Sequence, residues 1–149
     1  MELSDEEKHI LYWAGLFHDI GKIAIGDQIL QKPGPLTPEE FKVITTHPAE
    51  GVKIISAVRG STHWTLRASN HHEKVNGNGY PRGLKGEEIP KGARILRVAD
   101  AYSAIISKRP YRDPFSKEEA IKILIEGKNI EFDPYFVDIL LAILEKEKL

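Results

Sequence analysis

One helix-start signal recurs along the chain. A serine or threonine is followed three residues later by a glutamate at Ser4–Glu7, Thr37–Glu40 and Ser116–Glu119. In such a capping box, the hydroxyl and the glutamate bind backbone N–H groups that the first helical turn leaves unpaired. The three boxes therefore predict helices over about 5–20, 38–46 and 117–126, with Gly127 ending the third.

Prolines mark further helix starts at Pro48, Pro90 and Asp133-Pro134. They predict helices over about 48–58, 90–107 and 134–147, and one more helix is expected to end near His72. No convincing alternating strand pattern is present, although Ile23-Ala24-Ile25 has the character of a short extended piece. The 149 residues are therefore expected to form a single all-α domain, a bundle of about seven helices over 1–149.

The composition limits the classes of function. There is no cysteine, so any metal must be bound by His, Asp or Glu, which favours Fe, Mn or a His/carboxylate zinc site. No apolar run approaches the roughly 20 residues that cross a bilayer, and no leader-like start is seen, so no membrane association and a cytoplasmic location are expected. A net charge of −1 gives no general attraction to nucleic acid polymers.

The first candidate site is the segment Leu16–Lys22, in which His18 and Asp19 stand side by side after an apolar helical run. His and Asp are usual ligands for divalent metals, and Gly21 can adopt the left-handed conformation that ends a helix. Lys22 would then direct a mobile positive charge toward whatever the metal holds. Taken alone, such a pair is more often a surface pair or a helix-end hydrogen bond.

Helix geometry divides the six histidines. His9 lies nine residues before His18, on the opposite side of the helix at about 100° per residue, and His63 lies about 12 Å along a helix from His71. The other four stand at helix ends, which converge readily at one end of a bundle. These four are His18, His47, His71 and His72.

Asp100 lies close to the apolar stripe of its predicted helix, where an unpaired carboxylate would be costly. A nearby arginine or a metal would satisfy it equally well. With the four histidines and Asp19, it completes a set of four imidazoles and two carboxylates, more than one metal with open positions needs. Two bridged ions are the natural inference, with Asp19 as the favoured bridge.

Several motifs in order resemble the HD-GYP family of HD-domain metal phosphohydrolases. They are His18-Asp19-Ile20-Gly21-Lys22, His47-Pro48 with Gly51, the segment from His71-His72 to Gly79-Tyr80-Pro81, Ile89-Pro90 to Asp100, Arg109-Pro110-Tyr111-Arg112 and Phe132-Asp133-Pro134. The resemblance implies an all-α domain that hydrolyses cyclic di-GMP with a cluster of two or three metals. Such domains are often attached to a sensory or receiver domain.

By motif match, the resemblance assigns His18, Asp19, His47, His71, His72 and Asp100 as metal ligands. It places Lys22, Arg109 and Arg112 at substrate phosphate and Tyr80 in the signature loop. The implied reaction is attack of a metal-bridging hydroxide on phosphorus, with Asp19 and Lys22 as the catalytic residues.

The chain departs from the family pattern in three ways. Only about seventeen residues precede His18, so the family's first helix, with its further His or Glu ligand, is expected to be absent. Asn76 and Ser103 stand where the family usually has aspartates. These departures favour a rival hypothesis, a non-catalytic nucleotide- or protein-binding module. A third hypothesis keeps the metal chemistry but changes the substrate to another cyclic dinucleotide or a nucleotide. An uncovered apolar strip near Trp13 and Phe17 further predicts a homodimer.

Overall fold

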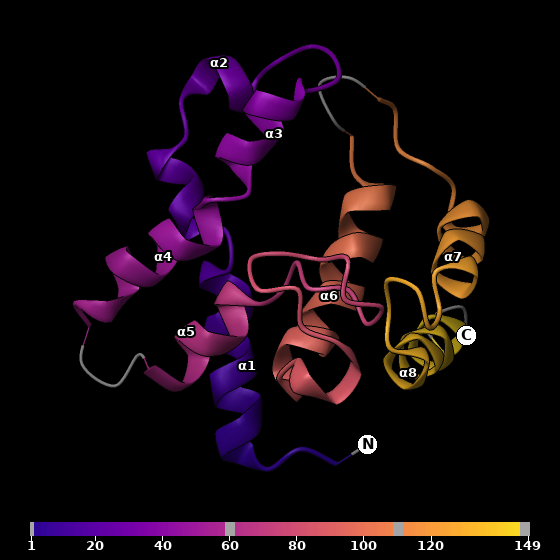
Figure 1. Ribbon diagram of the computed structural model, residues 1–149. Coiled ribbons are helices and arrows are strands. Elements are labelled where there is room, and N and C mark those ends of the chain that lie inside the picture. The colour runs from indigo at the N-terminus through magenta and orange to yellow at the C-terminus, as the bar shows by residue number, and fades with distance from the viewer. Residues whose placement is uncertain (1, 59–61, 109–111, 147–149) are drawn as a thin grey trace.

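The computed structural model describes residues 2–58, 62–108 and 112–146. These residues form eight α-helices, two 3-10 helices and no strand, so the all-α prediction is confirmed (Figure 1). The elements are α1 (Asp5–Phe17), η1 (Ile20–Ala24), α2 (Asp27–Leu30), α3 (Pro38–Ile44), α4 (His47–Ser56), α5 (Thr62–Ser69), η2 (Gly86–Glu88), α6 (Lys91–Ile106), α7 (Lys117–Glu126) and α8 (Pro134–Lys146). None of the described helices combines the length and the apolar character needed to cross a membrane.

The predicted capping boxes are all formed. In each one, the hydroxyl accepts a hydrogen bond from the glutamate N–H, and the glutamate carboxylate accepts one from the N-cap N–H. Helix α8 opens at Pro134 as expected, with the Tyr135 N–H donating to Asp133 Oδ1 at 2.9 Å. Local sequence thus supplies the capping groups at these helix starts.

The region around Gly21 differs from the prediction. Helix α1 ends at Phe17 rather than near residue 20, and Ile23 and Ala24 lie in η1 rather than in an extended piece. Gly21 is not in the left-handed region, but a Cβ placed on it would lie 1.9 Å from the His47 carbonyl oxygen. Glycine is needed here because η1 packs backbone to backbone against α4.

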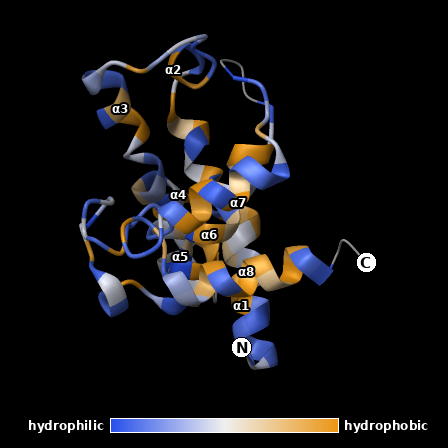
Figure 2. Ribbon diagram, turned by 90° about the vertical axis from the view of Figure 1, so that its right-hand side faces the viewer, coloured by the Kyte–Doolittle hydropathy of each residue, from blue (hydrophilic) through white to orange (hydrophobic). Residues whose placement is uncertain are grey.

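Helix α6 runs through the middle of the bundle and joins two cores (Figure 1). On one side, Leu96 packs with Ala14 of α1 and Ala68 of α5. On the other side, Val98 belongs to a cluster with residues of α7 and α8, and Figure 2 shows apolar residues concentrated along α6 and α8. Because both faces are buried, α6 fixes the N-terminal helices relative to the C-terminal pair.

Candidate metal centre

Three histidines at helix ends are oriented in the same way. In each, Nδ1 faces the backbone carbonyl oxygen three residues earlier: Gly15 for His18 at 2.6 Å, Ile44 for His47 at 2.7 Å, and Ala68 for His71. A carbonyl can only accept, so Nδ1 carries the hydrogen and Nε2 keeps its lone pair when the ring is neutral. This is the orientation that metal-binding histidines usually have.

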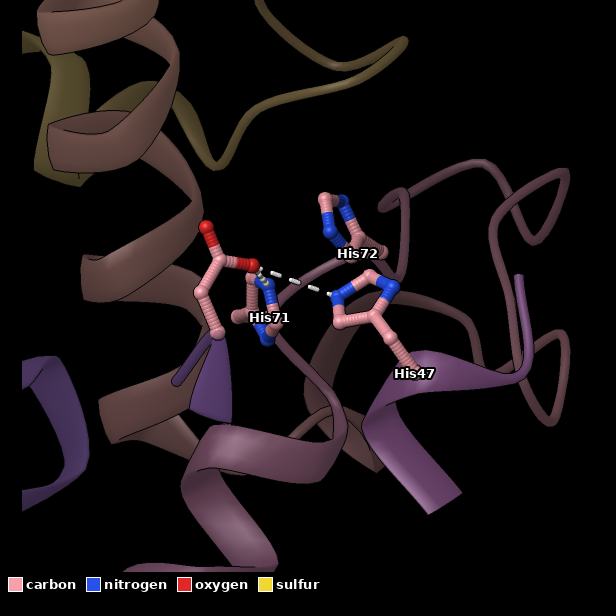
Figure 3. A group of neighbouring side chains, drawn as sticks. His47, His71 and His72 are labelled. Atoms are coloured by element: carbon pink, nitrogen blue, oxygen red, sulfur yellow. Dashed lines mark ion pairs between the residues drawn. The ribbon is translucent and has the colours of Figure 1, made fainter. Parts of the chain in front are cut away.

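The six predicted ligands fall into two groups that share His71. One group contains Asp19, His47, His71 and His72, and the other contains His18, His71 and Asp100. Within each group, the candidate ligand atoms all lie within 4.8 Å of one another. Figure 3 shows His47, from the start of α4, facing the adjacent pair His71 and His72, which follow α5. The structure thus brings together all six side chains.

The donor atoms are buried without hydrogen-bond partners. They are Nε2 of His18, His47, His71 and His72, and Oδ1 of Asp19. His47 and His71 are completely buried. A buried polar atom left unpaired costs about 1–3 kcal/mol, so five unpaired atoms in two adjoining groups would be strongly destabilising. Divalent ions would satisfy these atoms together, so the residues present fit a metal centre.

Asp19 stands between the two groups. Its Oδ1 lies 3.3 Å from His47 Nε2, and its Oδ2 lies 3.4 Å from His18 Nε2. The Lys22 ammonium also contacts Oδ2, at 2.6 Å. The two oxygens therefore face different groups, which is the arrangement that a bridging carboxylate requires.

The charges favour a cation between the carboxylates. Asp100 and then Asp19 raise the pKa of His18 to about 10, which means that a positive charge is stabilised at this ring. Burial raises the pKa of Asp19, but His18, His47 and Lys22 outweigh it and hold that pKa well below its usual range. A metal ion could take the place of the proton on His18.

Two of the remaining rings, those of His71 and His72, are held in the neutral form. Burial lowers the pKa of His71 to about 4 and that of His72 to about 2. Neutral imidazole is the metal-binding form, so at neutral pH neither residue needs to lose a proton to bind.

The alternative partner considered for Asp100, a nearby arginine, is engaged elsewhere. Arg94 pairs with Asp133 at 2.7 Å and Arg97 with Glu131 at 2.5 Å. Asp100 Oδ1 instead lies 3.6 Å from His18 Nε2. Among the described residues, Asp100 thus faces the metal donors.

The signature loop folds back on the centre. A Cβ on Gly79 would lie 2.6 Å from the His72 carbonyl oxygen, so glycine permits this close approach. The Tyr80 ring stacks on His72 with centroids 4.7 Å apart, and burial raises the pKa of Tyr80 to about 12. Tyr80 therefore stays protonated near neutral pH, and it lines the larger of the two hollows beside the centre.

Glu73 organises this loop, and sequence reasoning missed it. Its carboxylate is buried and accepts hydrogen bonds from the N–H groups of Arg82 at 2.7 Å and Leu84 at 3.0 Å. Its place directly after His71-His72 is the only sequence signal that could have drawn attention to it.

Two hollows meet at the centre, and Lys22 and His72 line both. The larger, about 1,110 Å³, is walled mainly by apolar residues of α2, α3 and the segment between them. The smaller, about 470 Å³, contains Asp19, Asp100 and Arg112. Arg112 Nη2 donates to the carbonyl oxygens of Ala104 at 3.0 Å and Ile105 at 3.3 Å.

Other residues singled out from the sequence lie away from this centre or cannot be placed. His9 is exposed and accepts a hydrogen bond from Trp13 Nε1 at 2.9 Å, as expected for a histidine outside the site. Arg109 and Tyr111 lie outside the described residues, and the side chain of His63 is also not described.

The HD domain family profile matches residues 1–136. The chain belongs to the HD domain family. The resemblance to HD-GYP proteins inferred from the motifs is thereby confirmed. The chain is 43% identical over 141 residues to the cyclic di-GMP phosphodiesterase response regulator RpfG of Xanthomonas campestris pv. campestris, covering 93% of this chain and 37% of that protein.

A second relative has a different named substrate. The 3'3'-cGAMP-specific phosphodiesterase 2 of Vibrio cholerae is 37% identical over 141 residues, covering 93% of this chain and 27% of that protein. Among solved structures, the HD-GYP-type protein Bd1817 of Bdellovibrio bacteriovorus superposes with a TM-score of 0.71 at 24% identity, covering 95% of this chain and 45% of that one. This structure supports the fold, and the chain spans less than half the length of each of these proteins.

Proposed function

We propose that this HD domain is a metal-dependent phosphodiesterase that hydrolyses cyclic di-GMP. The observation that carries the proposal is the pair of donor groups, whose buried atoms lack hydrogen-bond partners and which adjoin a hollow also lined by Lys22, Arg97 and Arg112. The 43% identity to a cyclic di-GMP phosphodiesterase supports the choice of substrate.

The proposed ligands are His18, Asp19, His47, His71, His72 and Asp100, with Asp19 as the bridge. When bound, two divalent ions would activate water and neutralise charge on the phosphodiester. The set of imidazoles and carboxylates, without thiolates, favours Fe or Mn. Lys22 is held at the point where the two hollows meet, so its ammonium can neutralise a substrate phosphate there.

The remaining substrate contacts come from both sides of the centre. Arg112 lines the smaller hollow and is suited to a phosphate oxygen, while Tyr80 in the larger hollow bounds the space beside His72. Arg109 is assigned to phosphate by motif match alone. A sensory or receiver domain in the same protein and a cytoplasmic location stay predictions.

One alternative substrate has specific support. The relative named for 3'3'-cGAMP is 37% identical to this chain, and both molecules present two phosphodiesters to the same centre. A non-catalytic role is disfavoured because the six proposed ligands come together even though Asn76 and Ser103 stand where the family usually has aspartates. The Asn76 side chain accepts from the Asn78 N–H at 2.9 Å, forming a local turn.

The test is purification without oxygen or chelator, metal analysis, and turnover of cyclic di-GMP and 3'3'-cGAMP with identification of the products. We expect about two Fe or Mn ions per chain and faster hydrolysis of cyclic di-GMP. Absence of bound metal after reconstitution with both ions would contradict the dinuclear site. Metal binding without turnover of either dinucleotide would favour the non-catalytic module.

A further inference from the structure

The smaller hollow lies between the metal donors and the C-terminal part of the chain. Asp19 and Asp100 form one side of it, and Ile123, Glu131 and Phe132 form the opposite side. Its volume of about 470 Å³ falls in the range usual for small-molecule sites. It is therefore a space in which the part of a substrate not held by metal can lie.

Arg97 is fixed in the wall of this hollow. It stands one helical turn before Asp100 on α6, so the two side chains share a helix face. Its Nη2 contacts Glu131 Oε2 at 2.5 Å, and its guanidinium lies 5.4 Å from the centre of the Phe132 ring. Only 16% of its side chain is exposed. The guanidinium is thus positioned before any ligand arrives.

The charge on Arg97 is only partly neutralised by its partner. Glu131 also pairs with Lys74, through Oε1 at 3.0 Å, so two cations share one carboxylate. A guanidinium has five N–H donors, and the Nε of Arg97 is buried without a partner. An anion that enters the hollow can therefore interact with the positive charge on Arg97 that Glu131 does not neutralise, close to the candidate metal ligands.

Arg94 provides an internal comparison on the same helix. It pairs with Asp133 at 2.7 Å, lies 5.7 Å from the centre of the Phe136 ring and also has a buried Nε without a partner. It does not line the hollow. The two arginines thus make the same kinds of structural contact, and access to the hollow distinguishes Arg97.

We infer that Arg97 binds the phosphodiester of the cyclic dinucleotide that is not being cleaved. The inference rests on the proposed function, since a cyclic dinucleotide has two phosphodiesters and the metal centre acts on one. Arg97 would hold the second by charge-assisted hydrogen bonds. It would thereby select dinucleotides over substrates that carry a single phosphodiester.

The experiment compares Arg97→Gln, Arg97→Lys and Arg94→Gln in the metal-loaded protein. For cyclic di-GMP we expect Arg97→Gln to raise KM about ten- to a hundredfold with little change in kcat, because binding remote from the reacting phosphorus is lost. Arg97→Lys should restore part of the affinity. With bis(4-nitrophenyl) phosphate, which has one phosphodiester, Arg97→Gln should leave kcat/KM within about twofold of wild type.

Thermal unfolding of the variants separates binding from structure. Arg97→Gln and Arg94→Gln should lose similar stability, whereas only Arg97→Gln should change KM for the dinucleotide. Equal KM values in wild type and Arg97→Gln, or equal losses on both substrates, would overturn the inference while leaving the phosphodiesterase proposal intact. Absence of dinucleotide turnover by the wild type would overturn both.

Discussion

At the scale of single residues, Asp19 has the most contacts within the centre. One oxygen faces His47 and His71, at 3.3 Å and 3.9 Å, and the other faces His18 and Lys22. A carboxylate in this position can hold two cations together, whereas each histidine offers a single nitrogen. Loss of Asp19 should therefore affect both halves of the centre.

We predict that Asp19→Ala abolishes hydrolysis and lowers metal content, measured by turnover and by elemental analysis of the same sample. His9→Ala is the control, because His9 is exposed and contacts only Trp13 among the interactions described for it. It should stay within a few-fold of wild type. Loss of activity in a folded His9→Ala protein would show that the site has been placed wrongly.

Glu73 gives a second prediction at this scale. Glu73→Gln replaces one carboxylate oxygen by an N–H donor, which cannot accept from Arg82 or Leu84. We expect the free energy of unfolding to fall by about 1–3 kcal/mol, as measured by denaturant titration, and kcat/KM to fall as the signature loop loosens. Exposed Glu87→Gln is the matched control and should change neither value.

At the scale of elements, the centre depends on the fit of η1 against α4. Gly21 lies against the His47 backbone, and Gly51 of α4 in turn approaches the Gly21 nitrogen. Two glycines, far apart in sequence, thus allow the elements carrying Asp19 and His47 to touch. This contact sets the separation of those two ligands.

We predict that Gly21→Ala destabilises the fold by about 2 kcal/mol or more and weakens metal binding, because the new methyl group would meet the His47 carbonyl oxygen at 1.9 Å. Denaturant titration and metal analysis test this. Gly34→Ala is the control: a Cβ there meets nothing within 4 Å, so stability should hold or rise slightly. Equal stability of the two variants would argue against close packing at Gly21.

The sequence predicted those elements whose causes are local. Capping hydroxyls and prolines act within one turn, so the starts of α1, α3, α7 and α8 could be read directly. The short helices η1, α2 and η2 could not be predicted, because each is too short to show a helical repeat of apolar residues. The end of α1 at Phe17 was also not predicted, and η1, which follows at Ile20, packs against α4.

The residues of the candidate site likewise fall into those that the sequence predicted and those that it did not. The six candidate metal ligands stood out because their His and Asp residues could be sorted by helix phase and matched to motifs. Glu73 and Arg97 did not, since buried glutamate and paired arginine look like ordinary charged residues in a sequence. Their roles depend on the loop and the hollow, which arise only when distant segments pack together.

At the scale of the whole molecule, metal should contribute to stability. The candidate donor atoms come from segments spread between residues 18 and 100, so ions bound there would hold several elements together. Ions that bind the folded state at a hundred times their Kd add about 2.7 kcal/mol. We predict that chelation lowers Tm by on the order of 5–10 °C. Added Mn²⁺ should restore it, and an unchanged Tm in metal-depleted protein would contradict this.

The association state is a second prediction for the whole molecule. Tyr12 and Leu16 lie one turn apart on α1 and are 64% and 58% exposed, beside the stacked rings of Trp13 and Phe17. Covering this apolar strip favours a homodimer. Light scattering should show a dimer that Leu16→Glu shifts toward monomer, while Ile143→Glu on α8 does not. A monomeric wild type would refute the prediction.

The wide spacing of the candidate ligands along the chain also affects the stage of folding at which the metal centre can form. They lie at the end of α1, the start of α4, the turn after α5 and the middle of α6, so no adjacent pair of elements carries a full set. A growing chain on the ribosome cannot complete the centre until Asp100 has emerged and α6 has docked. If the proposed function is correct, partly folded species would therefore be inactive, and hydrolysis would begin only when the whole bundle has assembled.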